Sequence, residues 1–264
     1  MATYTFVNQH YYPEVVSAGQ HLTDLSRYLA SKGHDVYVVT GRGGYTDESV
    51  DYPAREVCQG VNIRRLWTSR FNNRGWLRIL DYMGFYLLAL LHVLRKSNGG
   101  TYIYLTTPPL VATIGYLVSL IKDHNYVIWC MDLHPEAERE VGLLEENSIV
   151  DKFVFAAREK AHSAAGSRVA LSKAMASKME YSTRCDTPTC VIPVWTRGEE
   201  VYPVEHSDNP VRQELGYDCD DVIVEYSGNA GLAHTFGEIV DVIRQYKNSR
   251  RDSPQFVFIG GGER

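Results

Sequence analysis

The sequence predicts an α/β protein with one complete Rossmann-like domain, built on a parallel sheet, followed by the first βαβ part of a second one. Short apolar segments alternate with helical patterns through the first 194 residues, which is typical of a sheet covered by helices on both faces. A stretch with scattered charge, two prolines and no apolar period then follows, and a second strand–helix–strand pattern begins after it.

The chain opens with TYTFV, a buried strand candidate at 3–7. The segment 18–31 places Leu22, Leu25 and Leu29 on one helical face, and Gly33 is well placed to end that helix. A second strand candidate, VYVVT at 36–40, comes next. Strand, helix and strand within about 40 residues form the βαβ unit of a parallel sheet.

The same alternation runs to the end of the chain. In the first part, strands are expected at 60–67, 101–107, 125–132, 168–172 and 189–194, and helices at 76–94, 110–121, 148–165 and 173–181. In the second part, a short helix is expected at 211–216, strands at 221–228 and 254–262, and a helix at 236–246. We therefore assign 1–195 to a first domain, 196–208 to a linker and 209–264 to a second domain. The last is shorter than the roughly 100–150 residues of a doubly wound domain, which indicates that it is incomplete.

Composition and charge limit the cellular compartments and the classes of partner that are expected for this chain. The chain has 264 residues, a formal charge of −5, and 44% hydrophobic and 22% charged residues, so it is ordinarily globular and nucleic acid is a poor partner. The five cysteines show no disulfide or zinc spacing. The sequence shows no secretory signal and no run of about 18 apolar residues. These features predict a cytoplasmic protein.

One segment departs from the acidic average. Residues 64–96 carry seven Lys or Arg residues against Asp81 alone. The apolar helix expected at 76–94 lies within this segment and could rest on anionic lipid headgroups, as a peripheral membrane contact. The alternative is an ordinary packed helix with its arginines on the solvated end.

In open α/β sheets, ligands bind beyond the carboxyl ends of the strands. Gly19 lies at the start of the first helix, after two small residues, so a ligand could reach free N–H groups at the positive end of that helix. The alternative is a long turn in which Gly19 only caps the helix. There is no G-x-G-x-x-G fingerprint here, which disfavours NAD.

A second loop of this kind, CMDLHPEAERE, follows the strand expected at 125–132. Asp132 ends that strand, and His134 and Glu136 come directly after it. A carboxylate and an imidazole at a strand end suit acid–base chemistry or the orientation of a hydroxyl group. The alternative is an Asp that caps a helix, with the His and Glu facing solvent.

Two glycine-rich loops lie in the second domain. The first, YSGNAGLAHTF, could cradle a diphosphate with its N–H groups, and the second, FIGGGER, could approach a nucleotide closely. Tight turns without a ligand are the alternative for both. The residues concerned are Gly228, Asn229, Gly231 and His234 in the first loop, and Gly260, Gly261 and Gly262 in the second.

Motifs that cover nearly all of the chain come in a specific order: YYPEVVSAGQHLTDLSRYLASKGHDVYVVTG, YLTTPPLVATIG, WCMDLHPEAERE, VALSKAMASKM, VIPVW, and NPVRQELG with the two glycine-rich loops behind it. In this order they resemble the family 4 glycosyltransferases, retaining enzymes of the GT-B fold. The likeness is greatest to the bacterial branch that builds surface polysaccharides, often on lipid-linked acceptors.

This resemblance implies that the first domain binds the acceptor and the second binds a nucleoside-diphosphate sugar. It places Gly19 and the first glycine-rich loop beside the donor diphosphate, and Asp132 close to the reacting sugar. From their positions in the loops, we also assign His134 and Glu136 to the catalytic group and the second glycine-rich loop to the donor. Tyr11, Tyr12 and Glu14 are expected to line the acceptor side. No metal and no cofactor are expected, because enzymes of this fold generally work without a metal.

The chain departs from the family in two ways. The loop SGNAGLAHT lacks the Arg and Lys that many members use to hold the diphosphate, and the E-x7-E donor motif does not occur before Arg264. We therefore expect a glycosyltransferase fragment that is inactive alone. The alternative is a non-catalytic module that binds a glycan precursor or a partner transferase. An incomplete second domain would also leave a sheet edge open to self-association.

Overall fold

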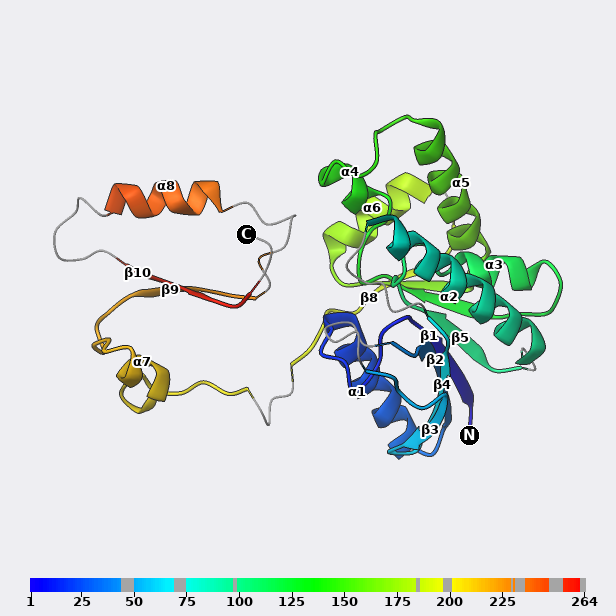
Figure 1. The fold of residues 1–264 in the computed structure, drawn as a ribbon, viewed down its shortest axis with the longest axis horizontal. Helices are drawn as coiled ribbons and strands as arrows, with labels where there is room; N and C mark the ends of the chain where they lie inside the picture. The colour runs from blue at the N-terminus through cyan, green and yellow to red at the C-terminus, as the bar shows by residue number, and fades with distance from the viewer. Residues whose placement is uncertain are drawn as a thin grey trace. The chain divides into compact units, whose positions relative to one another are not determined.

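The computed structural model describes residues 1–43, 50–68, 75–96, 99–183, 186–196, 201–228, 230, 236–246 and 254–261. Contacts divide the chain into two compact units, Met1–Trp195 and Thr196–Arg264 (Figure 1). Each unit has its own sheet, with helices packed on it in unit 1. The predicted α/β fold, with one Rossmann-like domain and part of another, is confirmed.

In the described part of unit 1, eight strands form one sheet in the order β3-β4-β2-β1-β5-β6-β7-β8. The strands are β1 Thr3–Val7, β2 Asp35–Gly41, β3 Arg55–Cys58, β4 Val61–Leu66, β5 Thr101–Tyr104, β6 Tyr126–Trp129, β7 Ser167–Ala170 and β8 Thr189–Val191. The helices are α1 Ser17–Ser31, α2 Gly75–Lys96, α3 Thr113–Ser119, α4 Glu136–Glu140, α5 Ile149–Ala164 and α6 Lys173–Thr183.

One edge of the sheet differs from the prediction. Strand β3 pairs antiparallel with β4, whereas the other strand pairs in this sheet are parallel. The hairpin turns at Gln59 and Gly60, with φ of 49° and 77°, the two positive values that a two-residue type I′ turn needs. A four-residue strand of mixed polarity gives too short a pattern to predict. The sheet is therefore parallel except at this edge.

Helix α1 forms where the sequence predicts it, because its apolar residues share one face. Leu22 is fully buried against the sheet, and Gly33, with φ of 82°, ends the helix by donating its N–H to the carbonyl of Ala30. Helix α3 is shorter than predicted. Leu110 has a positive φ of 64°, so the helix cannot begin there and starts at Thr113 instead.

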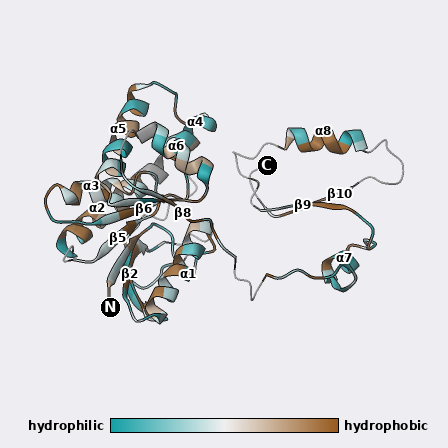
Figure 2. Cartoon of the chain, turned by 180° about the vertical axis from the view of Figure 1, so that it is seen from behind, coloured by the Kyte–Doolittle hydropathy of each residue, from teal (hydrophilic) through white to brown (hydrophobic). Residues whose placement is uncertain are grey.

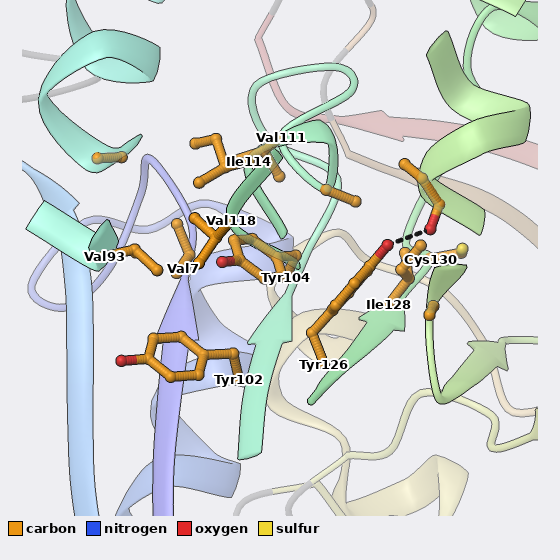
Figure 3. Packing of buried hydrophobic residues seen from close by; sticks show 14 of the residues in the cluster. Val7, Val93, Tyr102, Tyr104, Val111, Ile114, Val118, Tyr126, Ile128 and Cys130 are labelled. Carbon is orange, nitrogen blue, oxygen red and sulfur yellow. Dashed lines mark hydrogen bonds between the residues drawn. The ribbon is translucent and has the colours of Figure 1, made fainter. Parts of the chain in front are cut away.

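The two faces of the sheet have separate apolar cores. Helix α1 packs on β2 and β4 on one face, and α2, α3 and α5 pack together on the other. Figure 3 shows the second core, in which the rings of Tyr104 and Tyr126 meet edge to face. The Tyr126 hydroxyl donates to the carbonyl of Ala161 on α5. Gly115 lies against both rings, where a Cβ would come within 2.9 Å of each, so α3 packs close to the sheet.

The described part of unit 2 contains a single parallel strand pair. Its elements are a 3₁₀ turn at His206–Asp208, α7 Pro210–Glu214, β9 Ile223–Ser227, α8 Gly237–Tyr246 and β10 Gln255–Ile259. Figure 2 shows apolar residues in the strand pair and in the middle of α8. Val224, Phe258 and Ile259 nevertheless stay about half exposed. Self-association through these surfaces stays a prediction.

Glycine is required where β2 ends. A Cβ on Gly41 would lie 2.9 Å from the backbone oxygen of Gln9, so an alanine there would push two backbone segments apart. We expect Gly41→Ala to lower the free energy of unfolding by about 1–3 kcal/mol. The measurement is urea unfolding followed by circular dichroism.

Gly84 on α2 is the matched control. A Cβ there would meet no atom within 4 Å, and alanine favours the helix over glycine by up to about 1 kcal/mol. Gly84→Ala should therefore leave stability unchanged or raise it. Equal destabilisation by both variants would contradict the role given to Gly41.

Candidate active site

The site lies where the order of the sheet reverses. From the central strand β1, the chain places β2, β4 and β3 on one side, and β5 to β8 on the other. In open α/β sheets, such a switch point leaves a crevice at the carboxyl ends of the two diverging strands. Three loops meet there: 8–16 after β1, 105–112 after β5 and 130–135 after β6.

Gln9 connects the elements on both sides of this crevice. Its N–H donates to the carbonyl of Thr107 at 2.8 Å, beyond β5. Its own carbonyl accepts from the N–H of Gly41 at 2.8 Å and from the Thr40 hydroxyl at 2.9 Å, both on β2. Its side-chain Nε2 donates to Asp81 on α2 at 2.9 Å. One residue therefore fixes the loop after β1 relative to β2, β5 and α2.

Thr106 makes the equivalent connection to the loop after β6. Its Oγ1 accepts from the backbone N–H groups of Met131 and Asp132, both at 3.2 Å. The Asp132 side chain is exposed, and among the described residues its carboxylate makes no hydrogen bond or ion pair. Asp132 therefore presents a free carboxylate at the carboxyl end of the sheet, from a backbone that Thr106 holds in place.

The two tyrosines of the opening loop have different environments. Tyr11 is only 3% exposed, and its hydroxyl is 2.8 Å from Ser26 Oγ on α1; burial raises the pKa of the phenol. Tyr12 is 39% exposed, with the guanidinium of Arg27 4.3 Å from the centre of its ring. The carbonyl of Tyr12 accepts from buried Arg65 at 3.0 Å. Tyr12 can thus meet a ligand, whereas Tyr11 anchors the loop to α1.

Glu14 is also largely internal. Its carboxylate lies 2.8 Å from Nδ1 of His10, and both side chains are less than a tenth exposed. The Asn8 side chain donates to the carbonyl of His10 at 2.7 Å. These contacts fold residues 8–14 into a compact loop and leave little of Glu14 for an acceptor to contact.

The structure at the start of α1 is compatible with both interpretations of Gly19, a residue needed for a tight turn and part of an anion site. A Cβ on Gly19 would come 3.3 Å from the carbonyl oxygen of His10, so the glycine lets the opening loop lie across the first turn. The N-cap residue is Val16, which offers no side-chain acceptor to the helix. The first-turn N–H groups of this 15-residue helix therefore lack a side-chain cap, and an anion could take that place.

His134 and Glu136 are held in contacts of their own. Buried Arg158 of α5 lies 2.7 Å, through Nη1, from both carboxylate oxygens of Glu136, and the same nitrogen donates to the carbonyl of His134 at 3.1 Å. Nδ1 of His134 is 2.6 Å from Glu138. The N-cap of α4 is Pro135, so Asp132 is not its cap. Of the three residues, Asp132 alone presents an exposed side chain.

A small hollow of about 30 Å³ lies beneath this loop, lined by Thr106, Asp132, His134, Arg158 and His162, among others. It can hold a water molecule and is too small for a sugar ring.

The predicted donor loops of unit 2 come together at the carboxyl ends of β9 and β10. The N–H of Gly228 donates to Ile259, and that of Ala230 to Gly261. A Cβ on Gly260 would lie 1.9 Å from the Gly228 oxygen, so a glycine is required at position 260 for this close approach. Gly228, Gly260 and Gly261 line a hollow of about 390 Å³. Asn229, Gly231, His234 and Gly262 lie outside the described residues.

This architecture is that of the GT-B glycosyltransferases. The chain is similar in structure to sucrose-phosphate synthase from Thermosynechococcus elongatus, with a TM-score of 0.69 and 15% identity over 99% of this chain and 63% of that one. It is similar to HepE from Anabaena in complex with UDP and glucose, with a TM-score of 0.61 and 14% identity over 99% of this chain and 62% of that one.

A third similar structure is WaaG, a glycosyltransferase involved in lipopolysaccharide biosynthesis, with a TM-score of 0.61 and 12% identity over 98% of this chain and 64% of that one. The chain thus spans a little under two thirds of each of these proteins. At such identities the likeness establishes the fold alone. The chain matches no protein-family model and no curated protein sequence.

Four residues that organise the site are not among the predicted ones: Gln9, Arg65, Thr106 and Arg158. Each acts on a backbone group or a carboxylate of a segment 22 or more residues away in sequence, so spacing alone cannot reveal them. Arg65 does leave a signal, because it interrupts the apolar alternation of Val61 and Ile63 along β4. The buried face of α5 around Arg158 already carries Asp151 and His162, so it gives no such signal. A buried arginine needs a partner.

His162 should make the stability of unit 1 depend on pH. Burial, and then the charges of Arg158 and Arg168, lower the pKa of this imidazole to about 3. Below the ordinary histidine pKa of about 6.5, the unfolded chain binds a proton that the folded chain does not. The folded state therefore loses stability as the pH falls from about 6.5 toward 3. Between pH 7.5 and 4.5 we expect His162 to account for about 2 kcal/mol of the loss.

Urea unfolding at these two pH values tests this expectation. His162→Gln, which cannot titrate there, should lose less stability on acidification than the wild type. His206→Gln, at an exposed histidine of unit 2, should behave as the wild type does. An equal loss in all three proteins would refute the assignment.

Proposed function

We propose that the protein transfers a glycosyl group from a nucleoside-diphosphate sugar to a hydroxyl acceptor, with retention of anomeric configuration. The observation that carries this proposal is the geometry at the switch point of unit 1. Asp132, whose carboxylate is unpaired among the described residues, and the uncapped first turn of α1 both lie at the carboxyl edge of the sheet, where Gln9 and Thr106 hold the loops. A nucleotide-sugar has the matching chemistry, an anionic diphosphate joined to a ring of hydroxyl groups.

The proposed reaction breaks the bond between the anomeric carbon and the diphosphate oxygen, and forms a bond from that carbon to the acceptor oxygen. The acceptor proton passes to the departing diphosphate on the same face, which gives retention. The negative charge on the diphosphate is stabilised by N–H groups of the α1 first turn, without a metal ion. Asp132 accepts a hydrogen bond from a reacting hydroxyl and orients it.

The similar structures support the donor and acceptor classes. HepE has been solved with UDP and with UDP-glucose, and WaaG is involved in lipopolysaccharide biosynthesis. We extend the proposal to the synthesis of a cell-surface polysaccharide or glycolipid, on the cytoplasmic face of the membrane. The acceptor would then be lipid-linked, and residues 64–96 would contact the bilayer.

A transfer assay tests this function. The protein expressed from its complete reading frame is incubated with radiolabelled UDP-, GDP- and ADP-sugars and a membrane lipid extract. We expect transfer from one donor class, with the anomeric configuration kept in the product when it is read by NMR. Asp132→Asn should lower kcat about 100-fold, as expected when a reacting hydroxyl group is no longer held in position.

Glu140→Gln is the matched control, because Glu140 is an exposed carboxylate on neighbouring α4. It should keep full activity. Binding of a nucleotide-sugar without transfer to any acceptor would instead indicate a binding module. No binding of any nucleotide-sugar would overturn the proposal.

A further inference from the structure

The outward face of α2 is apolar. Phe85, Ala89 and Val93 point into the core and are fully buried. On the opposite side, four large apolar side chains spaced three or four residues apart form one continuous stripe over three turns. They are between 36% and 61% exposed and comprise Leu80, Met83, Leu87 and Leu91. A helix of a water-soluble domain normally presents polar residues there, so this face has the composition of a covered surface.

A groove opens beside this stripe. Between the C-terminal half of α2 and the sheet face of β2, β4 and β3 lies a hollow of about 940 Å³. Its lining is mixed: Val39 and Leu66 from the sheet and Leu88 and Leu91 from the helix are apolar, and polar side chains of the sheet, Thr5 and Asn62 among them, lie beside these. Leu91 belongs to both the groove and the stripe, so the two surfaces are continuous. Figure 1 shows α2 running along this face of the sheet, beside α3.

The rim of the groove is cationic. Arg55 and Arg64 stand directly opposite each other across the β3–β4 ladder, an arrangement of like charges that destabilises a sheet by itself. Arg95 and Lys96 join them from the end of α2. The helix dipole accounts for cations at a helix C-terminus, but it does not account for the arginine pair on the sheet.

The titratable groups in the groove also indicate that its electrostatic potential is positive. Burial lowers the pKa of His92, and the charges of Arg64, Lys96, Arg55 and Arg95 lower it further, so four cations act on one ring. Glu56 is the acidic residue that lines the groove, and its carboxylate is bound by buried Arg65 at 2.6 Å. The groove therefore combines a partly apolar lining with a surplus of positive charge.

We propose that this face of unit 1 docks on a bilayer that contains acidic phospholipid. The apolar stripe of α2 enters the acyl region of the leaflet that contacts the protein. The phosphate of one lipid lies between four cationic side chains, those of Arg55, Arg64, Arg95 and Lys96. Helix α2 lies along the surface, since no helix in the described part of the chain is both long and apolar enough to cross a membrane. Charge complementarity and the continuous apolar stripe fit a lipid surface better than a protein partner or a free anion.

Membrane docking depends on the proposed function only for its biological role, which would be to bring the enzyme to a lipid-linked acceptor. Asp81, on the inner side of α2, accepts the hydrogen bond from Gln9 at the carboxyl edge of the sheet. A bilayer that holds α2 would therefore hold the helix to which the loop of the candidate active site is tied. A lipid-linked acceptor in the same bilayer would lie within reach of that loop.

Vesicle sedimentation tests the docking surface. The complete protein is mixed with vesicles of phosphatidylcholine alone, or with about one third phosphatidylglycerol. We expect binding to the acidic vesicles alone. Arg55→Gln with Arg64→Gln should weaken it about thirtyfold, as two lost charges near an anionic surface imply. Met83→Ser with Leu87→Ser should weaken it more than tenfold.

Matched controls lie on α5. Lys152→Gln with Lys160→Gln removes two exposed charges there, and Phe153→Ser removes an exposed apolar side chain; neither should change binding. Circular dichroism and the urea midpoint of each variant show that it is folded. Equal binding to both kinds of vesicle, no binding, or equal effects of control and test variants would overturn the proposal.

Two further arms separate the alternatives. Inorganic phosphate, added at constant ionic strength, should not displace the protein from acidic vesicles; displacement would indicate a site for free phosphate. Self-association that is abolished by Met83→Ser with Leu87→Ser, without lipid binding, would indicate a protein partner and overturn the proposal. If the protein does not bind vesicles but still transfers sugar to a water-soluble acceptor, the docking proposal fails and the proposed function stands. The two failures are therefore distinguishable.

Discussion

The backbone of Gln9 is the constraint on which the candidate site depends. At the central strand of a sheet whose order reverses, the loop must be tied to neighbours on both sides, or the crevice has no fixed width. Gln9 meets this requirement with its N–H bound to the loop after β5 and its carbonyl bound to β2. Gly41 must be glycine because the same carbonyl lies against it. The position of the α1 start, and hence of its free N–H groups, follows from this arrangement.

Charged residues in unit 1 fall into two groups with different tasks. Arg65 and Arg158 are buried, and each binds one carboxylate together with one backbone carbonyl of a site loop. Removing either one would leave buried acceptors unsatisfied, which costs more than the hydrogen bond itself contributes. Asp132, by contrast, is exposed and unpaired among the described residues, and its position comes from its backbone. The buried charges that hold the loops and the exposed carboxylate of Asp132 are thus separate residues along the same edge of the sheet.

Much of the fold can be predicted from the sequence, because the spacing of apolar residues within each strand and helix is a local pattern. The strand TYTFV, helix α1 and its end at Gly33 are found where the pattern predicts them. The β3 hairpin is not, since four residues carry too little pattern. At the candidate site, the sequence pattern predicts where the loops lie, but it does not predict which of their side chains are buried or paired. The burial of Tyr11 and the pairing of Glu136 with Arg158 depend on contacts between distant segments, which no local spacing encodes.

The central claim is that a nucleotide-sugar binds at the carboxyl edge of unit 1, with its diphosphate near the start of α1. Amide hydrogen exchange followed by mass spectrometry, on the complete protein with and without saturating UDP or GDP, tests this most directly. We expect slower exchange in residues 16–22 and in the loop 105–108, and no change along α2. Saturating binding with unchanged exchange in both of those segments would contradict the claim.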